Sequence, residues 1–163
     1  MLLLLVAFAC AFARCATAQT CQTPTQLTPD IDFYVDTCQS GYAPQLLCGG
    51  LPTTGPTVAF GLYLSYPSSS YTVSVNPASS AFDPVLVVQS SQCGESGNCP
   101  FTVDDHGAGE AEAFNFWSLD HGGEYYVLVT STNPYAACGQ ALVILSGEAG
   151  DTTDGIFRSG FNY

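Results

Sequence analysis

The sequence has 163 residues, and fourteen Asp and Glu residues against two Lys and Arg residues give it a formal net charge of −12. Nucleic acids and anionic membrane surfaces require basic patches, and so few basic residues cannot build one. Both partners are therefore excluded. Cations, calcium above all, and uncharged surfaces such as glycans are the electrostatically favourable partners, although surface acids also serve simply to keep exported proteins soluble.

The N-terminal residues 1–18 have the pattern of a secretory signal peptide. Leu2 to Phe12 is an unbroken apolar run that is too short to span a bilayer, and Ala16-Thr17-Ala18 supplies a small-x-small cleavage pattern. The usual basic n-region is missing, because Arg14 follows the apolar run. We expect a mature chain of about 145 residues, long enough for one domain. Its net charge would be 1 − 14 = −13, since Arg14 is removed.

Six cysteines remain after the signal peptide, which predicts three disulfides in an oxidising compartment: extracellular, periplasmic or at the cell surface. A zinc site is the alternative, but no Cys-x-x-Cys spacing is present. Cys93 and Cys99 flank a glycine-rich turn, so we expect them to pair with each other. Cys48 and Cys138 each precede an apolar strand, and they would pair if those strands were neighbours. Cys21–Cys38 follows by elimination, although sequence alone cannot decide among fifteen pairings.

The expected strands, taken in chain order, are short and separated by turn residues. Residues 31–36 alternate apolar and acidic side chains, which predicts an edge strand. Residues 38–56 carry glycines, prolines and two cysteines and indicate a loop. Residues 58–65 and 71–76 alternate in polarity on either side of Pro67-Ser68-Ser69-Ser70, which predicts a hairpin.

The second half of the chain continues this pattern. Residues 85–88 and 142–145 are apolar at every position, so we expect both runs to be buried. Shorter alternating runs at 101–103, 113–117 and 125–130 predict three more strands. No stretch shows helical periodicity. About eight short strands indicate an all-β fold, an antiparallel β-sandwich of the Greek-key or jelly-roll kind.

The central stretch resembles the bacterial pre-peptidase C-terminal (PPC) domain family. The motifs that carry the resemblance occur in order: Phe82-Asp83-Pro84, then Asp104-Asp105-His106-Gly107-Ala108-Gly109, the strand Ala113 to Phe116, and a Gly-x-Tyr-Tyr-x-x-Val strand at Gly123 to Val129. The resemblance covers about residues 56–147 of a domain spanning 19–147. Residues 148–163 form a linker and a tail that is similar to Ile-Phe-Arg-x-Gly-Phe endings of exported proteins.

The resemblance implies a small jelly-roll sandwich with no catalysis of its own. Domains of this family usually follow secreted proteases and are thought to help secretion or substrate binding, and some relatives bind calcium. We therefore expect a secreted, non-catalytic accessory or binding module, here standing alone, whose partner is an unidentified protein or glycan surface. The alternative is a calcium-dependent carbohydrate- or protein-binding domain.

Four acids in the motif region are candidate calcium ligands: Asp83, Asp104, Asp105 and Glu110. Calcium takes six to eight oxygen ligands, often from turns. No full D-x-D-x-D-G signature is present, and aspartates also shape turns by hydrogen bonding to the backbone. The calcium hypothesis and this turn-forming interpretation both remain open.

Other candidate chemistry is weaker. Asp105-His106-Gly107 recurs as Asp120-His121-Gly122, a pair of histidines that turn chemistry explains equally well. In Gly94-Glu95-Ser96-Gly97 the second glycine comes one residue too early for a nucleophile elbow, and no nucleophile, base and orienting group occur together. We therefore expect no enzyme.

Aromatic side chains offer a route to sugar binding by stacking, with Trp117 and Tyr125 more typical of the core. The others in this group are Tyr63, Tyr66, Tyr126 and Tyr135.

Overall fold

The computed structural model describes residues 20–29, 31–64, 71–90, 92–116 and 123–147. The predicted signal peptide and the C-terminal tail lie outside these residues. Within them, no helix is long and apolar enough to cross a membrane.

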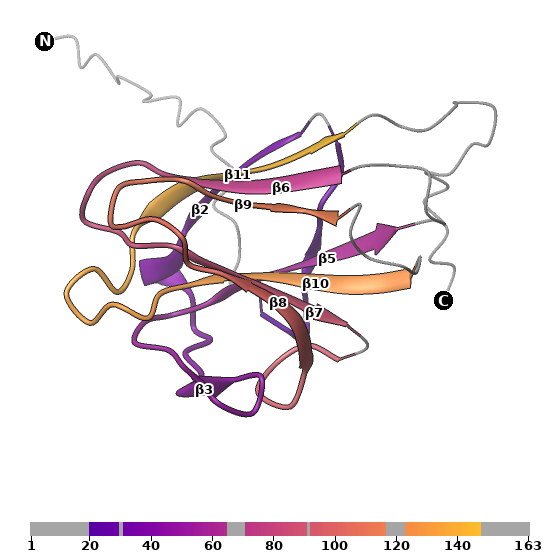
Figure 1. The fold of residues 1–163 in the computed structure, drawn as a ribbon, viewed down its shortest axis with the longest axis horizontal. Coiled ribbons are helices and arrows are strands. Elements are labelled where there is room, and N and C mark those ends of the chain that lie inside the picture. The colour runs from indigo at the N-terminus through magenta and orange to yellow at the C-terminus, as the bar shows by residue number, and fades with distance from the viewer. Residues whose placement is uncertain (1–19, 30, 65–70, 91, 117–122, 148–163) are drawn as a thin grey trace, which may run out of the picture.

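Two β-sheets packed face to face form the molecule (Figure 1). Sheet A has the strand order β1-β5-β10-β7-β8, and sheet B has the order β2-β11-β6-β9. A two-stranded ribbon, β3–β4, and a 3-10 turn, η1, lie outside the two sheets. The bounds are β1 Thr25–Gln26, β2 Asp32–Asp36, η1 Thr37–Gln39, β3 Leu46–Leu47, β4 Leu51–Pro52, β5 Val58–Leu64, β6 Tyr71–Pro77, β7 Val85–Ser90, β8 Asn98–Val103, β9 Glu112–Asn115, β10 Gly123–Thr130 and β11 Gln140–Gly147.

The main core lies between the two sheets and follows from the alternation of apolar side chains along each strand. On β6, Tyr71, Val73 and Val75 point inward and are buried, whereas the intervening Thr72 and Ser74 are only half-buried. Aromatic pairs contribute to this core, for example Phe101 and Phe114 with ring centroids 4.6 Å apart. The all-β sandwich predicted from the sequence is confirmed.

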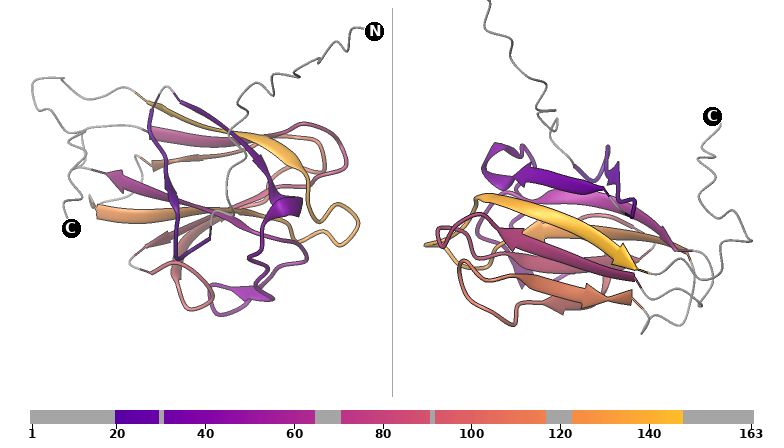
Figure 2. Two further views of the ribbon diagram at one scale, coloured as in Figure 1. Left: turned by 180° about the vertical axis from the view of Figure 1, so that it is seen from behind. Right: turned by 90° about the horizontal axis from the view of Figure 1, so that it is seen from above.

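Sheet A is covered on both faces. Leu86 and Val88 of β7 point into the main core, and Val85 and Val87 point the other way into a second cluster with Leu47 of β3. Cys21, which precedes β1, packs against this cluster and belongs to the outer covering, but most of the cover is the chain between η1 and β5. The view from behind in Figure 2 shows this segment against the outer side of sheet A. The prediction that residues 85–88 form a strand buried on both faces is therefore confirmed.

Among the described residues, sheet B is covered on one face only. Val143 and Leu145 of β11 are buried in the core, but Leu142 and Ile144 on the opposite face are only half-buried. The prediction that residues 142–145 are fully buried is wrong for these two side chains. A run of apolar residues indicates that burial of both strand faces is favourable. It does not indicate whether another part of the chain covers the face of the sheet that points away from the core. The predicted edge position of residues 31–36 is confirmed, since β2 ends sheet B.

The predicted hairpin between residues 58–65 and 71–76 does not form. β5 belongs to sheet A and pairs with β1 and β10, whereas β6 belongs to sheet B and pairs with β11 and β9. Alternating polarity shows only that each strand has one face toward a core. Both members of a hairpin and two strands in facing sheets satisfy that pattern equally well.

The disulfides join Cys21 to Cys93, Cys38 to Cys138 and Cys48 to Cys99. The expected pairings Cys93–Cys99, Cys48–Cys138 and Cys21–Cys38 are therefore all wrong, although all six cysteines do form three disulfides. Two of the three bridges, Cys21–Cys93 and Cys48–Cys99, tie the outer covering of sheet A to the loop and strand that follow β7.

Each wrong pairing has a structural reason. The apolar strands that the pairing of Cys48 with Cys138 assumed to be neighbours are β5 and β11, which lie in different sheets, so these two cysteines are not neighbours. Cys38 reaches Cys138 because the Thr37 backbone N–H donates to the Gly139 carbonyl at 2.9 Å. Cys93 and Cys99 flank a tight turn, yet each meets a different segment of the outer covering.

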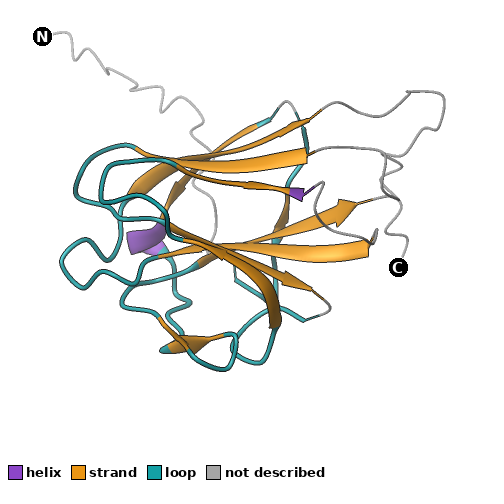
Figure 3. Ribbon diagram, in the orientation of Figure 1, coloured by secondary structure: helices purple, strands orange, loops and turns teal. Residues whose placement is uncertain are grey.

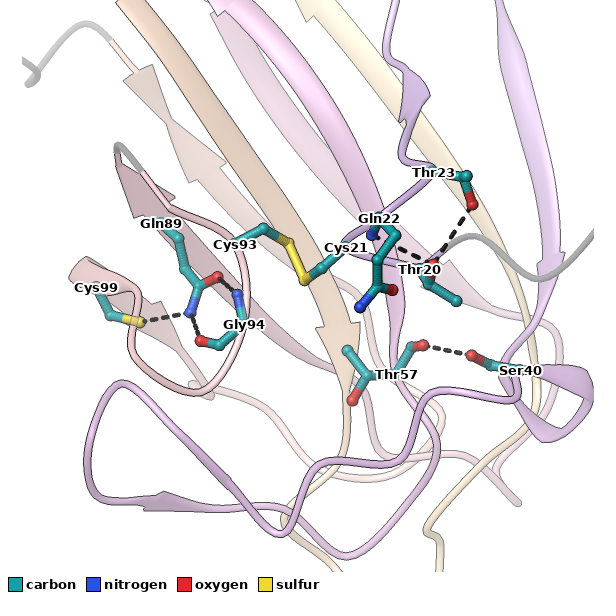
Figure 4. Close-up of a disulfide and its surroundings, with 10 residues drawn as sticks. All are labelled: Thr20, Cys21, Gln22, Thr23, Ser40, Thr57, Gln89, Cys93, Gly94 and Cys99. Carbon is teal, nitrogen blue, oxygen red and sulfur yellow. Dashed lines mark hydrogen bonds between the residues drawn. A yellow bond between two sulfur atoms is a disulfide. The ribbon is translucent and has the colours of Figure 1, made fainter.

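Gln89 fixes the turn between these two cysteines (Figure 4). Its side-chain amide donates to the Gly94 carbonyl at 2.7 Å, and its amide oxygen accepts from the Gly94 backbone N–H at 2.7 Å. The amide nitrogen also lies 3.3 Å from the Cys99 sulfur. A fully buried side chain on β7 therefore holds the turn between Cys93 and Cys99, two cysteines that belong to different disulfides.

Candidate functional site

The four acids expected to bind calcium all lie at one end of the sandwich, in or beside the loops that connect β6–β7, β8–β9 and β10–β11 (Figure 3). Backbone hydrogen bonds hold these loops together: Gly109 N–H donates to the Phe82 carbonyl at 2.9 Å, and Asp83 N–H donates to the Ala136 carbonyl at 3.1 Å. The topology therefore gathers motifs that are separated in sequence, because β6, β8 and β10 all end on this side.

Two of the four acids bind the same loop segment. Asp83 accepts a hydrogen bond from the Asn133 side-chain amide at 2.8 Å, and Asp104 accepts one from the Thr132 hydroxyl at 3.1 Å. Asp105 and Glu110 are exposed. In the described ranges, no three or more His, Cys, Asp and Glu side chains form a group that could hold a metal ion. Asp83 and Asp104 thus serve to fasten the β10–β11 loop.

Glu112, which the sequence analysis did not single out, is the most buried acid among the described residues at this end. Its carboxylate accepts from the His106 backbone N–H at 2.7 Å, and its second oxygen lies 3.5 Å from His106 Nδ1. The Glu112 side chain is 1% exposed and that of His106 is 55% exposed. The alternation of residues 112, 114 and 116 was a signal that Glu112 faces inward with Phe114 and Phe116.

The remaining catalytic and metal candidates are the histidine pair and Ser96. His121 lies outside the described residues, so the His106–His121 pair is not placed. Ser96 is exposed in the Gly94–Gly97 turn, where the Gly97 N–H donates to the Gly94 carbonyl at 3.1 Å. The structure gives this serine the role of a turn residue.

The candidate sugar-stacking aromatics divide into core and surface residues. Tyr125 is buried in the main core, as expected, whereas Tyr66 and Trp117 lie outside the described residues. Tyr63 is 60% exposed and Tyr135 is 97% exposed. Tyr126 is half-buried, since part of its ring packs against the second cluster. Tyr34, which the sequence analysis did not propose as a binding residue, is 75% exposed on β2.

Tyr63 and Tyr126 lie on the same outer face of sheet A. Tyr63 of β5 is directly opposite Glu124 of β10, and Tyr126 is directly opposite Gly61. Opposite residues in an antiparallel pair point to the same face, with Cβ atoms about 4.5–5.5 Å apart, and diagonal neighbours are about 7–8 Å apart. We refer to Tyr63, Glu124 and Tyr126 as the Tyr63–Tyr126 surface.

Two features shape this surface. Gly61 has no side chain, and the Gln26 amide occupies the space where a Cβ would lie. The pKa of Tyr126 is raised above its ordinary value by burial and, second, by the negative charge of Glu124. The Tyr126 phenol is therefore neutral at physiological pH and close enough to Glu124 to respond to its charge.

Three solved structures are similar in fold. They are the pre-peptidase C-terminal domain of a collagenase from Bacillus anthracis (11% identity, TM-score 0.48), the Aeromonas hydrophila periplasmic inhibitor of g-type lysozyme, PliG (13%, 0.44), and CorA, a surface-associated copper-binding protein of Methylomicrobium album BG8 (12%, 0.48). Each covers 76% of this chain, and the alignments span 94%, 96% and 97% of the respective neighbours.

The first of these structures is a domain of the family that the sequence motifs resemble. No family model matches the chain, and no curated protein sequence matches it. Identities of 11–13% concern the fold alone.

Proposed function

We propose that this chain is a non-catalytic binding module that works outside the cytoplasm, in the extracellular space, the periplasm or at the cell surface. The observation that carries the proposal is that exposed tyrosines lie beside carboxylates on the outer faces of both sheets, where the described residues include no Lys or Arg. Tyr34 lies between Asp32 and Asp36 on one face of β2, and Tyr63 lies opposite Glu124. Exposed aromatic side chains with polar neighbours are typical of binding surfaces.

The disulfides support the extracytoplasmic location. Such bridges form and persist in oxidising compartments and are rare in the cytosol. They also support a binding role, since two of them hold the outer covering and the β7–β8 loop against the sheet that displays Tyr63. A rigid scaffold loses little conformational entropy on binding.

Binding to a defined panel tests the proposal. The purified oxidised protein is passed over immobilised collagen, chitin, cellulose and a basic protein such as cytochrome c. We expect retention on at least one support, and a variant in which Tyr34 and Tyr63 are both changed to serine should be retained less. A folded protein that no support retains would contradict a binding role. Turnover of generic ester, peptide or glycoside substrates that is abolished by Ser96→Ala or by changing a single acid would contradict the non-catalytic part.

A calcium-dependent binding module is the second proposal. One observation favours it: Asp83 Oδ1 is buried and accepts no hydrogen bond, while Asp104 approaches the same Thr132–Asn133 segment. Carboxylate oxygens are suitable calcium ligands, with Asp105 and Glu110 as the further candidates.

Thermal unfolding tests the calcium proposal. A ligand that binds the native state alone stabilises it by mass action, so millimolar calcium should raise the melting temperature and a chelator should lower it. The matched variant pair is Asp83→Asn, which should abolish the response, and Asp36→Asn on β2, which should leave it unchanged. An identical melting temperature with calcium and with chelator would exclude the site.

A further inference from the structure

The Tyr63–Tyr126 surface has features that select one kind of ligand. Two tyrosine rings are diagonal neighbours on one sheet face, with one ring exposed and the other half-buried. Glu124 is on the same face, directly opposite Tyr63 and two residues before Tyr126 on β10. The faces of aromatic rings carry negative electrostatic potential, and they attract cations within about 6 Å of the ring centroid. A carboxylate beside such rings adds a second attraction for the same cation.

Charge across the rest of the surface points to the same ligand. The described residues include nine acids and no Lys or Arg, because both arginines of the chain, Arg14 and Arg158, lie outside them. No described side chain other than His106 can therefore supply a cation to Glu124, and His106 lies in the β8–β9 loop beside Glu112. A surface of one sign concentrates oppositely charged partners and accelerates their association.

Burial defines which part of the surface is free. On the same face of sheet A, Ala59 and Leu128 are covered by the second cluster, and Gln89 is covered by the loop that carries Cys93. Tyr63 and Glu124 lie beyond this cover and are exposed. Tyr126 lies at its edge, where packing fixes the ring and leaves part of it accessible. The site therefore combines a rigid ring, a free ring and a carboxylate.

We propose that Tyr63, Tyr126 and Glu124 form a docking site for a lysine or arginine side chain of a basic protein partner. The inference rests on the proposed binding function and specifies its site and the chemistry of its partner. The cation lies against the two tyrosine rings and pairs with Glu124, while the surrounding acids steer the basic partner toward the domain. An uncharged glycan would leave Glu124 without a matching charge.

Fluorescence anisotropy with a labelled hexa-arginine peptide, a labelled hexa-lysine peptide and a labelled glycine-serine peptide tests this proposal on the oxidised protein. We expect both cationic peptides to bind, more weakly as sodium chloride is raised from about 50 to about 200 mM, and the neutral peptide not to bind. Tyr63→Ser and Glu124→Gln should each raise the Kd about fivefold, the size of one exposed cation–π contact or ion pair. Tyr63→Phe keeps the ring and should keep wild-type affinity.

The matched controls lie at the opposite end of the sandwich. Tyr135→Ser removes an exposed tyrosine and Glu110→Gln removes an exposed charge, and neither should change the Kd beyond twofold, that is, about 0.4 kcal/mol. Equal weakening by the test and control variants would show attraction by the whole acidic surface and overturn the site.

Two further results would also overturn the inference. One is the absence of cationic peptide binding, and the other is binding of an uncharged oligosaccharide that Tyr63→Ser abolishes. In both cases, retention on any support of the panel above would still uphold the proposed binding function. A protein that neither the panel nor the peptides bind would contradict both.

Discussion

At the scale of single residues, the buried polar groups identify which side chains the fold depends on. Glu112 is an acid in a position that alternation assigns to the core, and it is tolerated because it accepts the His106 backbone N–H at 2.7 Å. Asp83, Asp104 and Glu112 all bind atoms of neighbouring loops. Some of the acids near the sequence motifs therefore have a structural role, which is to attach loops to one another.

Replacing Glu112 with alanine should destabilise the protein. The change leaves the His106 N–H without its acceptor and creates a small cavity, and the expected loss is about 1–3 kcal/mol of the free energy of unfolding. Urea denaturation followed by circular dichroism measures it. Glu110→Ala, two residues away and exposed, should change the free energy by less than about 0.5 kcal/mol. Equal effects of the two substitutions would contradict the assigned role of Glu112.

Three tyrosines should make the protein sensitive to alkaline pH. Burial raises the pKa of Tyr42, Tyr125 and Tyr126, and Glu95 and Glu124 add to the effect at Tyr42 and Tyr126. Raised values mean that the native state favours the neutral phenol. The stability from this preference is complete below the ordinary pKa of 10.0 and is lost as pH rises through the native-state values.

Chemical denaturation between about pH 8 and pH 11 should therefore show the free energy of unfolding falling above about pH 10. Absorbance at the phenolate band follows the same ionisation. Tyr42→Phe should reduce the slope, and Tyr135→Phe, at a tyrosine that is 97% exposed, should not. Stability that rises with pH across this range would contradict the burial of these phenols.

At the scale of elements, close contacts between loops determine where a side chain can be added. A Cβ at Gly55 would overlap the Ala137 carbonyl, and one at Gly139 would lie 2.6 Å from the Phe82 Cβ. Both glycines lie where segments that are distant in sequence meet at the loop end of the sandwich. The loops from η1 to β5 and from β10 to β11 therefore pack against each other with no space for a methyl group.

Gly55→Ala should be strongly destabilising for this reason. The new methyl group meets backbone, which cannot rotate away, and overpacking of this kind costs about 1–3 kcal/mol or more. Gly50→Ala is the matched control, because a Cβ there meets nothing within 4 Å and its backbone conformation is ordinary. Thermal and urea unfolding of both variants provide the comparison, and a neutral Gly55→Ala would refute the described loop packing.

At the scale of the whole molecule, the disulfides connect parts of the chain that are far apart in sequence. The Cys38–Cys138 bridge has a sequence separation of 100 residues, and Cys21–Cys93 has one of 72. Long loops carry the largest loss of unfolded-state entropy when they are closed, so each bridge should contribute about 4–5 kcal/mol in the chain-entropy model. The domain should therefore be much less stable when reduced.

Removal of one bridge tests this estimate and the pairing together. The double variant Cys38→Ser, Cys138→Ser should lose about 4–5 kcal/mol of unfolding free energy and keep the other two disulfides. Non-reducing peptide mapping of the wild type should recover the Cys38–Cys138, Cys21–Cys93 and Cys48–Cys99 peptides. Recovery of a Cys93–Cys99 peptide would contradict the structure.

Local patterns in the sequence are sufficient for the fold class, most of the strands and the double burial of residues 85–88. The reason is that the alternation of apolar side chains along a strand is a local property. The sequence also indicates Tyr63, Tyr126 and Tyr135 as aromatic candidates. It could not indicate that Tyr63 lies opposite Glu124, since their separation along the chain gives no register between β5 and β10.

Only the tertiary structure determined the features that depend on which strands are neighbours. The assignment of β5 and β6 to different sheets removed the expected hairpin and, with it, the condition for pairing Cys48 with Cys138. The outer covering of sheet A selected the partners of Cys93 and Cys99. The described residues provide no such layer over sheet B, and Leu142 and Ile144 are therefore only half-buried. Strand pairing and layer coverage are long-range properties, which alternation and cysteine spacing leave open because several arrangements bury the same side chains.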